Sequence, residues 1–302
     1  MTAVPDRAHL LTEQRNPASA DLHRLAVREI VALFNRENRA ALVALDAAED
    51  GLAGFIMDVE PGFLRGGRLV YLGAGTSGRL AVLDASEVPP TFQAPPDRII
   101  GLIAGGDGAL RASSEGKEDD PAGALPELLA LNLGADDAVL GIAAGGTTPY
   151  VLGAIAWAKT LPHPPRTGLL SCAPVPSPTG CDHLVVIASG PEVVTGSTRL
   201  KAGTATKLAL NTISTALMVR LGKVYGNLMV DVRASNAKLR DRAARIISTL
   251  TDATRDEAFA LLEATDGQVK PAIVMRRLQV SVAEAQRMLT AVDGHLGKVI
   301  DR

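Results

Sequence analysis

Aromatic residues and cysteines are both scarce in this sequence. Phe, Trp and Tyr make up 3% of the 302 residues, so we expect neither a base-stacking surface nor an aromatic cage for a cation. The two cysteines, Cys172 and Cys181, form no C-x-x-C motif and belong to no His/Cys cluster. The sequence therefore predicts no structural zinc site.

A large excess of charge of one sign is also missing. The formal net charge is -2, which gives no electrostatic reason to expect a nucleic acid or an anionic membrane as a partner. No apolar stretch is long enough to cross a bilayer, and the N-terminus lacks the apolar segment of a signal peptide. These absences predict a protein of the cytoplasm.

The middle of the chain carries short apolar runs bounded by glycine, proline or charged residues. Segments long enough for a helix separate the first four runs. The runs are residues 68–73, 98–104, 138–144, 167–172 and 183–189. This alternation predicts an α/β fold, a doubly wound parallel sheet with helices on both faces. Ligands of such sheets bind at the carboxyl ends of the strands.

Helical patterns flank this region on both sides. Residues 19–64 are expected to be helical, with Ser19 as the N-cap, and the last part of the chain breaks into short helical pieces. There Thr254 and Ser281 are each followed by a glutamate three residues later, which is the pattern of a capping box. We therefore expect three regions: an N-terminal helical segment (1–50), an α/β domain (51–235) and a small C-terminal helical domain (236–302).

The first predicted strand leads into a glycine-rich loop. Gly73, Gly75 and Gly78 fit the pattern G-x-G-x-x-G, and Thr76 and Ser77 stand between the last two glycines. Backbone N–H groups at such a strand-to-helix turn bind phosphate. A dinucleotide site should have an acidic residue at the end of the second strand, about 20 positions further on, and that acid is missing. We therefore favour a monophosphate over a dinucleotide, and either ligand over an empty turn.

Two more loops combine glycine with hydroxyl side chains. The third predicted strand is followed by Gly145, Gly146, Thr147 and Thr148, and a later loop with Ser197 and Thr198 precedes a long helix that carries Lys201. Each loop alone is ordinary turn chemistry. Together the three loops predict a site for a small polyhydroxylated phosphate ester.

Glutamates are the candidates for acid–base chemistry, because all five histidines lie outside the glycine loops. Glu87 is expected at the end of the helix that the first loop begins, where Pro89 and Pro90 should stop it. Glu115 and Glu118 are three residues apart and could share a helix face. The default interpretation of their acidic stretch is a solvated surface.

Several long motifs resemble the N-acetylmuramic acid 6-phosphate etherase family. They are TEQRNPASADL (12–22), YLGAGTSGRLAVLDASEVPPTF (71–92), EGKEDD (115–120), GPEVVTGSTRLKAGTATKLALNTISTALM (190–218) and GKVYGNLMVDVRASN (222–236). The resemblance is continuous from about residue 12 to 250 and looser beyond. It implies a sugar isomerase (SIS) domain with a five-stranded parallel sheet, usually in a homodimer.

The resemblance also implies an activity. Members of the family cleave the D-lactyl ether of N-acetylmuramic acid 6-phosphate, giving N-acetylglucosamine 6-phosphate and D-lactate in cell-wall recycling, with no metal or organic cofactor. By the family's motifs, Glu87 of DASE is the acid and Glu118 of EGKED is the base, rather than Glu115. Glu192 and Lys201 lie in family-like motifs; Glu192 would orient a sugar hydroxyl or pair with Lys201.

The second loop departs from the family pattern, which usually reads A-S-G-x-T-P-Y with arginine at x. Here Gly145 replaces the serine and Thr147 the arginine. Loss of a hydroxyl donor costs about 1–3 kcal/mol if its partner is left unpaired, although water replaces part of it. We expect this departure to affect the affinity for the substrate more than the catalytic steps.

Two other functions fit the same motifs. One is a non-catalytic sugar-phosphate sensor, since the related glucokinase regulatory protein uses this scaffold for regulation; such a sensor would not need Glu87 and Glu118. The other is an aldose–ketose isomerase, which also starts by removing the C2 proton but needs no acid at an ether oxygen. A nicotinamide-dependent dehydrogenase is a weaker third interpretation.

Overall fold

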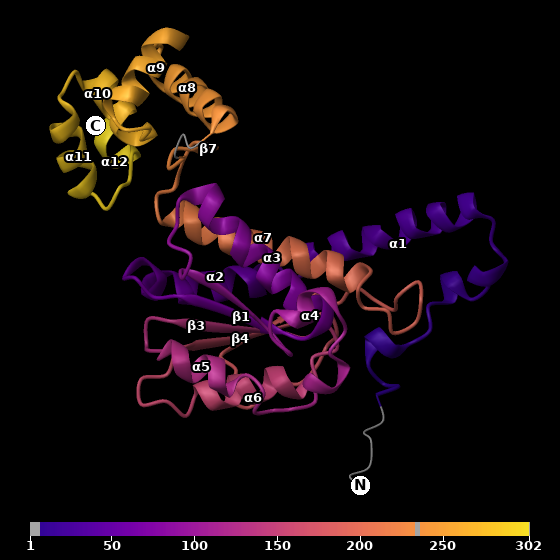
Figure 1. Cartoon of the computed structure of the whole chain (residues 1–302). Coiled ribbons are helices and arrows are strands. Elements are labelled where there is room, and N and C mark those ends of the chain that lie inside the picture. Colours follow the sequence, from indigo (N-terminus) through magenta and orange to yellow (C-terminus); the bar gives the residue numbers. More distant parts are fainter. Residues whose placement is uncertain (1–6, 233–235, 302) are drawn as a thin grey trace. The chain divides into compact units, whose positions relative to one another are not determined.

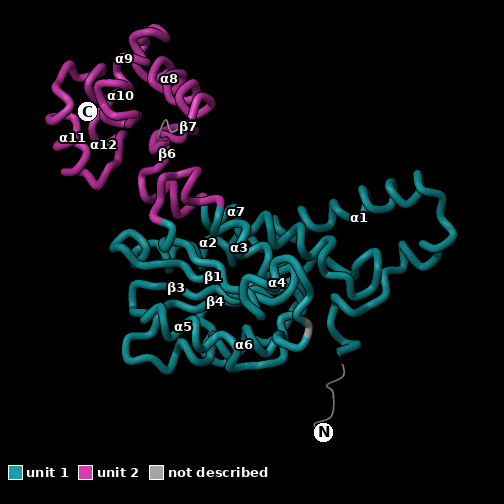
Figure 2. The backbone as a smooth tube through the Cα atoms, viewed as in Figure 1, with its two compact units in different colours: residues 1–86, 96–214 teal, residues 87–95, 215–302 magenta. Residues whose placement is uncertain are grey.

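The computed structural model describes residues 7–232 and 236–301 of the chain. They form two compact units (Figure 2). The first contains residues 1–86 and 96–214, and the second contains residues 87–95 and 215–302. No helix in the described part of the chain is long and apolar enough to cross a membrane.

The first unit is built on a five-stranded parallel sheet in the order β2-β1-β3-β4-β5. The strands are β1 (Leu69–Gly73), β2 (Ile99–Ile103), β3 (Ala138–Ile142), β4 (Arg166–Ser171) and β5 (His183–Val186). All five predicted strands and the parallel α/β fold class are confirmed. Every residue of β1 and of β3 is buried, as expected for central strands covered on both faces.

Helices cover both faces of this sheet (Figure 1). The helices α2, α3 and α7 lie over one face, and α5 and α6 lie over the other. Their bounds are α2 (Glu49–Leu64), α3 (Gly75–Phe92), α5 (Leu125–Leu131), α6 (Pro149–Ala158) and α7 (Lys201–Arg220), with the short α4 (Gly108–Arg111) and the 3-10 turn η4 (Glu115–Lys117) between β2 and α5. The strand order reverses between β1 and β3, and a crevice is expected there.

The N-terminal segment differs from the continuous helix that the sequence suggested. It makes three 3-10 turns, η1 (Leu11–Glu13), η2 (Pro17–Ser19) and η3 (Leu22–Arg24), before α1 (Val27–Ala47) begins. The expected N-cap at Ser19 is therefore wrong. The helix instead starts where the carboxylate of Glu29 accepts a hydrogen bond from the backbone N–H of Ala26, at 2.8 Å.

The expected helix stop at Pro89 and Pro90 is also wrong, because α3 continues through both prolines to Phe92. A proline lacks an N–H donor and its ring crowds the carbonyl four residues earlier, but its fixed φ is that of a helix, so the chain can keep helical dihedral angles in the last turn. The helix ends where Gln93 takes a φ of 51°, the left-handed conformation that commonly terminates helices.

The second unit contains a small hairpin and a group of short helices. They are β6 (Val224–Tyr225), β7 (Leu228–Met229), α8 (Ala237–Thr251), α9 (Arg255–Ala264), α10 (Val269–Leu278), α11 (Val282–Thr290) and α12 (Gly297–Ile300). The capping box of Thr254 and Glu257 is confirmed in full. At Ser281 the described residues form half of the box, in which the Ser281 hydroxyl accepts from the backbone N–H of Glu284. The domain boundary expected after residue 235 falls on residues 233–235, outside the described residues.

A cluster of polar groups fastens the N-terminal segment to the start of α7. The ammonium group of Lys201, whose side chain is 2% exposed, lies 2.8 Å from the carboxylate of Glu37 on α1. The same carboxylate oxygen accepts from the amide of Asn16 at 2.5 Å, and Asn16 also donates to the carbonyl of Pro191 at 3.1 Å. Burial raises the pKa of Glu37, but the hydrogen bonds from Lys201 and Asn16 outweigh it, and the pKa is lowered.

Replacing Lys201 by methionine should therefore destabilise the protein strongly. The change leaves the Glu37 carboxylate without its cation, and breaking such a pair costs about 3 kcal/mol. The double variant Lys201→Met/Glu37→Leu should recover a large part of that loss. Thermal and urea unfolding midpoints measure both effects.

The exposed pair of Arg65 and Asp136 supplies the control, because its side chains are 61% and 47% exposed. The variant Arg65→Met should lose no more than about 1 kcal/mol. Equal losses for Lys201→Met and Arg65→Met would contradict the importance given to the buried cluster.

Candidate functional site

A cavity of about 230 Å³ lies at the carboxyl ends of β1 and β3, where the strand order reverses. Most of its lining is polar or backbone. The lining residues are Arg7, Leu10, Thr12, Glu13, Ala74, Gly75, Thr76, Ser77, Glu118, Ala144, Gly145, Thr147, Thr148 and Thr198. Members of all three loops predicted from the sequence meet here, in a place where open α/β sheets bind ligands.

The first loop turns directly from β1 into α3. Gly75 has a φ of 54°, which side-chain-bearing residues rarely adopt, and Thr76 and Ser77 of the first helical turn line the cavity. Gly78 does not line it. A Cβ atom at Gly78 would lie 2.5 Å from Cγ1 of Ile103, so this glycine allows α3 to pack closely on the sheet.

The second loop contributes Gly145, Thr147 and Thr148 to the lining. Gly146 serves the packing of the loop instead, because its φ is 72° and a Cβ atom there would lie 2.7 Å from the side chain of Val175. Thr148 is the N-cap of α6, yet its hydroxyl makes no capping hydrogen bond to the described residues of that helix. The N-termini of α3 and α6 therefore both adjoin the cavity, and their N–H groups and dipoles favour an anion.

The third loop contributes Thr198 alone, and Ser197 is not among the lining residues. Glu192 is fully buried, and its carboxylate accepts hydrogen bonds from the backbone N–H groups of Lys201 and Ala202 at 3.0 and 2.9 Å. Burial raises the pKa of Glu192 against the lowering effect of these hydrogen bonds. Glu192 thus satisfies N–H groups in the first turn of α7, while the ammonium group of Lys201 is engaged by Glu37.

Glu118 stands in the cavity wall directly after the turn η4. Its backbone carbonyl accepts from the N–H of Tyr150 on α6 at 3.0 Å. Four residues earlier, the hydroxyl of Ser114 donates to the carbonyl of Ala104 beyond β2, at 2.9 Å. These two hydrogen bonds hold the segment against the sheet while the side chain of Glu118 stays exposed, and Glu118 also borders an adjoining hollow of about 60 Å³.

Glu87, the other predicted catalytic carboxylate, is an exposed residue on α3 within the second unit. It follows Gly75 by twelve residues of continuous helix. Glu87 is not among the residues that line the cavity.

Sequence reasoning missed the contribution of the N-terminal segment. Arg7, Leu10, Thr12 and Glu13 all line the cavity, and Thr12 is only 1% exposed. Thr12 and Glu13 are the first residues of the motif TEQRNP. This motif carries part of the family resemblance, but it does not by itself indicate that these residues line a cavity.

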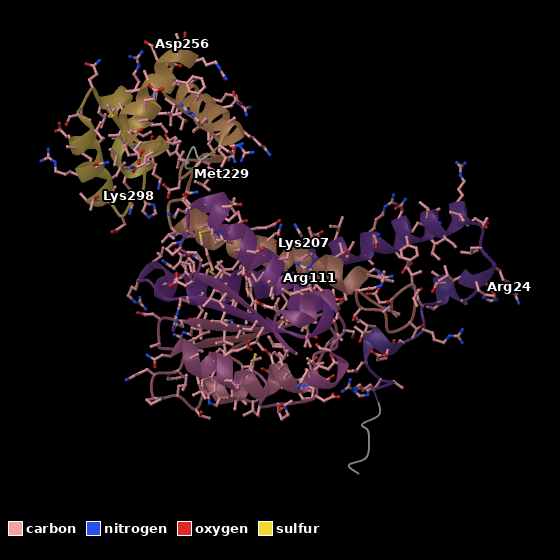
Figure 3. All side chains as sticks on the ribbon, in the orientation of Figure 1. Arg24, Arg111, Lys207, Met229, Asp256 and Lys298 are labelled. Atoms are coloured by element: carbon pink, nitrogen blue, oxygen red, sulfur yellow. The ribbon has the colours of Figure 1, made fainter. Side chains whose placement is uncertain are left out.

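The second unit has a hollow of its own, of about 460 Å³. Met229, which is labelled in Figure 3, is one of the residues that line it. Asn227, Arg242 and Arg245 line it together with Leu228, Ile246 and Thr249. None of the residues predicted from the sequence belongs to it. Across residues 7–232 and 236–301, no group of three or more histidine, cysteine, aspartate or glutamate side chains is placed to hold a metal ion.

Comparison with known proteins agrees with this fold. The model of the glucokinase regulatory protein N-terminal SIS domain matches residues 52–159. An N-acetylmuramic acid 6-phosphate etherase of Gloeobacter violaceus is 52% identical over 99% of this chain and 97% of its own length. The etherase of Serratia proteamaculans is 50% identical (97% and 98% covered), and that of Deinococcus radiodurans is 49% identical (96% and 94% covered). The chain belongs to the N-acetylmuramic acid 6-phosphate etherase family.

Proposed function

We propose that this protein cleaves the D-lactyl ether of N-acetylmuramic acid 6-phosphate, releasing D-lactate and N-acetylglucosamine 6-phosphate, as a step of cell-wall recycling. The observation that carries the proposal is the cavity between β1 and β3, where Glu118 faces two loops rich in hydroxyl and amide donors. It occurs in a chain about half identical to named etherases over nearly its whole length. A cytoplasmic location stays a prediction.

The phosphate group of this substrate suits the donors of the cavity. Thr76, Ser77, Thr147 and Thr148 line the cavity and carry hydroxyl groups, and two helix N-termini add backbone N–H groups. The lining includes the cation Arg7, whose guanidinium group would attract either of the substrate's two anionic groups. Gly78, Gly146, Glu192, Ser197 and Lys201 would act by supporting the loops.

The reaction starts at C2 of the open-chain sugar, where the aldehyde makes the C2 proton acidic. We assign the carboxylate of Glu118 as the base that removes this proton, so that the electron pair forms a C2=C3 double bond and the C3–O bond breaks. Glu87 gives its proton to the departing lactyl oxygen, which completes D-lactate. Proton transfers of this kind contribute about 10²–10⁴ each to the rate.

Water then adds to C3 of the unsaturated aldehyde. Glu87, now ionised, takes a proton from the water, and Glu118 returns its proton to C2. Both carboxyl groups regain their starting states, and the sequence of steps moves only protons and water. No metal or organic cofactor is needed for it.

We also propose that the protein acts as a homodimer. Val27, Val31 and Leu42 fall on one face of α1 and are 77%, 54% and 53% exposed. A second copy of the chain would cover this apolar stripe. Because Glu118 lines the cavity and Glu87 is not among its lining residues, we assign the acid and the base of each active site to different copies.

Release of D-lactate from N-acetylmuramic acid 6-phosphate tests the activity. Wild-type protein should release it, while Glu87→Gln and Glu118→Gln should each lose about 10²–10⁴ in kcat. Glu118→Gln should also lose exchange of the C2 proton with solvent. The exposed residue Glu49, at the start of α2, offers a control, since Glu49→Gln should leave the rate unchanged.

Other products would contradict the proposal. Tight binding of the sugar phosphate without lactate at any enzyme concentration would favour a regulatory sensor. A ketose 6-phosphate without lactate would favour an isomerase.

Mixing the two inactive variants tests the shared site. A dimer of one Glu87→Gln chain and one Glu118→Gln chain would keep one intact site if the carboxylates come from different copies. Random reassociation of equal amounts should then restore about a quarter of wild-type activity. If each site takes both carboxylates from one chain, mixing restores nothing.

A further inference from the structure

Thr12 buries a polar group beside the cavity. Its side chain is 1% exposed, and Oγ1 has no hydrogen-bond partner among the described residues. Thr12 also lines the cavity of about 230 Å³. An unpaired buried hydroxyl costs free energy that a hydrogen bond would recover, so such groups usually have a partner.

The position of Thr12 is fixed on both sides. On one side Leu10 is 5% exposed, and its carbonyl accepts from the N–H of Glu13 at 2.9 Å to close the turn η1. On the other side Asn16 is fastened to Pro191 and Glu37. Because the chain is anchored on both sides of Thr12, the Thr12 hydroxyl is held beside the cavity even without a bound ligand.

Gly145 of the second loop faces this hydroxyl. A Cβ atom at Gly145 would lie 3.6 Å from Oγ1 of Thr12 and 3.9 Å from Oγ1 of Thr147, which are ordinary contact distances. The backbone at Gly145 is also outside the left-handed region, so a side chain is sterically allowed there. The same Cβ atom would lie 3.8 Å from Cδ1 of Leu10, so there is room above Gly145 for a small group, and hydroxyls of two different segments border it.

We infer that Thr12 is a substrate-positioning residue whose hydroxyl hydrogen-bonds an oxygen atom of the bound sugar 6-phosphate above Gly145. This inference rests on the proposed sugar-phosphate ligand, but it does not depend on the lactyl ether being cleaved. It gives the N-terminal segment a direct part in the site. A hydroxyl carried by residue 145 would reach the same space from the opposite side.

The experiment compares Thr12→Val, Thr12→Ser and the wild type. The probe is N-acetylglucosamine 6-phosphate, titrated calorimetrically, and the KM and kcat of lactate release are measured in parallel. Thr12→Val should weaken binding and raise KM about tenfold, the range expected for one lost hydrogen bond, with a smaller effect on kcat. Thr12→Ser keeps the hydroxyl and should stay within about twofold of the wild type.

Thermal unfolding distinguishes a role of Thr12 in positioning the ligand from a role in stabilising the fold. Thr12→Val removes a hydroxyl that has no hydrogen-bond partner in the described part of the chain, so the unfolding midpoint should stay the same or rise. The control is Thr167→Val, since Thr167 is also buried but its hydroxyl donates to the carbonyl of Gly180 at 2.6 Å. This control should lower the midpoint and leave the affinity for the sugar phosphate unchanged.

The double variant Thr12→Val/Gly145→Ser tests the shared space. Serine at residue 145 should recover at least half of the affinity that Thr12→Val loses, because a hydroxyl there would reach the same ligand oxygen above Gly145. Absence of any recovery would overturn the placement of the hydroxyl above Gly145.

The remaining outcomes are equally decisive. Unchanged affinity in Thr12→Val, or a fall in its unfolding midpoint like that of Thr167→Val, would overturn the inference. So would a wild-type protein that does not bind the sugar phosphate at all. A wild type that binds it without releasing lactate would refute the proposed etherase activity alone, and the affinity series would still decide the role of Thr12.

Discussion

The reversal of strand order between β1 and β3 is the constraint on which the site depends. Parallel strands bring all their carboxyl ends to one edge, and connections that leave in opposite directions from neighbouring strands open a crevice between them. The loops after β1 and β3 enter α3 and α6 from the two sides of this crevice. Hydroxyl side chains, backbone N–H groups and two helix dipoles consequently surround one small volume without any cluster of positive charge.

The N-terminal segment completes this volume, and a buried ion pair holds the segment in place. The pair of Lys201 and Glu37, joined by Asn16, links the start of α7 to α1 and to the turns before it. Charges this well buried give little net stability compared with apolar packing, but they admit few alternative arrangements. We therefore infer that this ion pair fixes the position of Thr12 relative to the second loop.

The fold could be predicted from the sequence because its signals are local. Apolar runs fix the strands, and glycine next to hydroxyl residues marks the turns where a ligand binds, so the α/β class and most of the cavity wall were foreseen. Local patterns do not show which glycine faces a ligand and which allows close packing. Gly75 and Gly145 line the cavity, whereas Gly78 and Gly146 make room for Ile103 and Val175.

Contacts between residues that are far apart in the sequence could not be predicted either, because local patterns carry no information about them. The partner of Lys201 is 164 residues away in sequence, and nothing near Glu37 indicates the pairing. Thr12 and Glu118 meet through tertiary packing alone. The misplaced stop at Pro89 and Pro90 has a different origin, because the fixed φ of proline is compatible with the helical dihedral angles in the last turn of α3.

Isotope labelling tests the central claim, elimination followed by addition of water, most directly. The wild-type reaction with N-acetylmuramic acid 6-phosphate would be run in water enriched in oxygen-18, and both products would be analysed by mass spectrometry. Elimination breaks the bond between C3 and the lactyl oxygen, so the label is expected at C3 of N-acetylglucosamine 6-phosphate and not in the hydroxyl group of D-lactate. Label in that hydroxyl group, with the oxygen at C3 of the sugar retained, would mean attack of water on the lactyl carbon and would contradict the account.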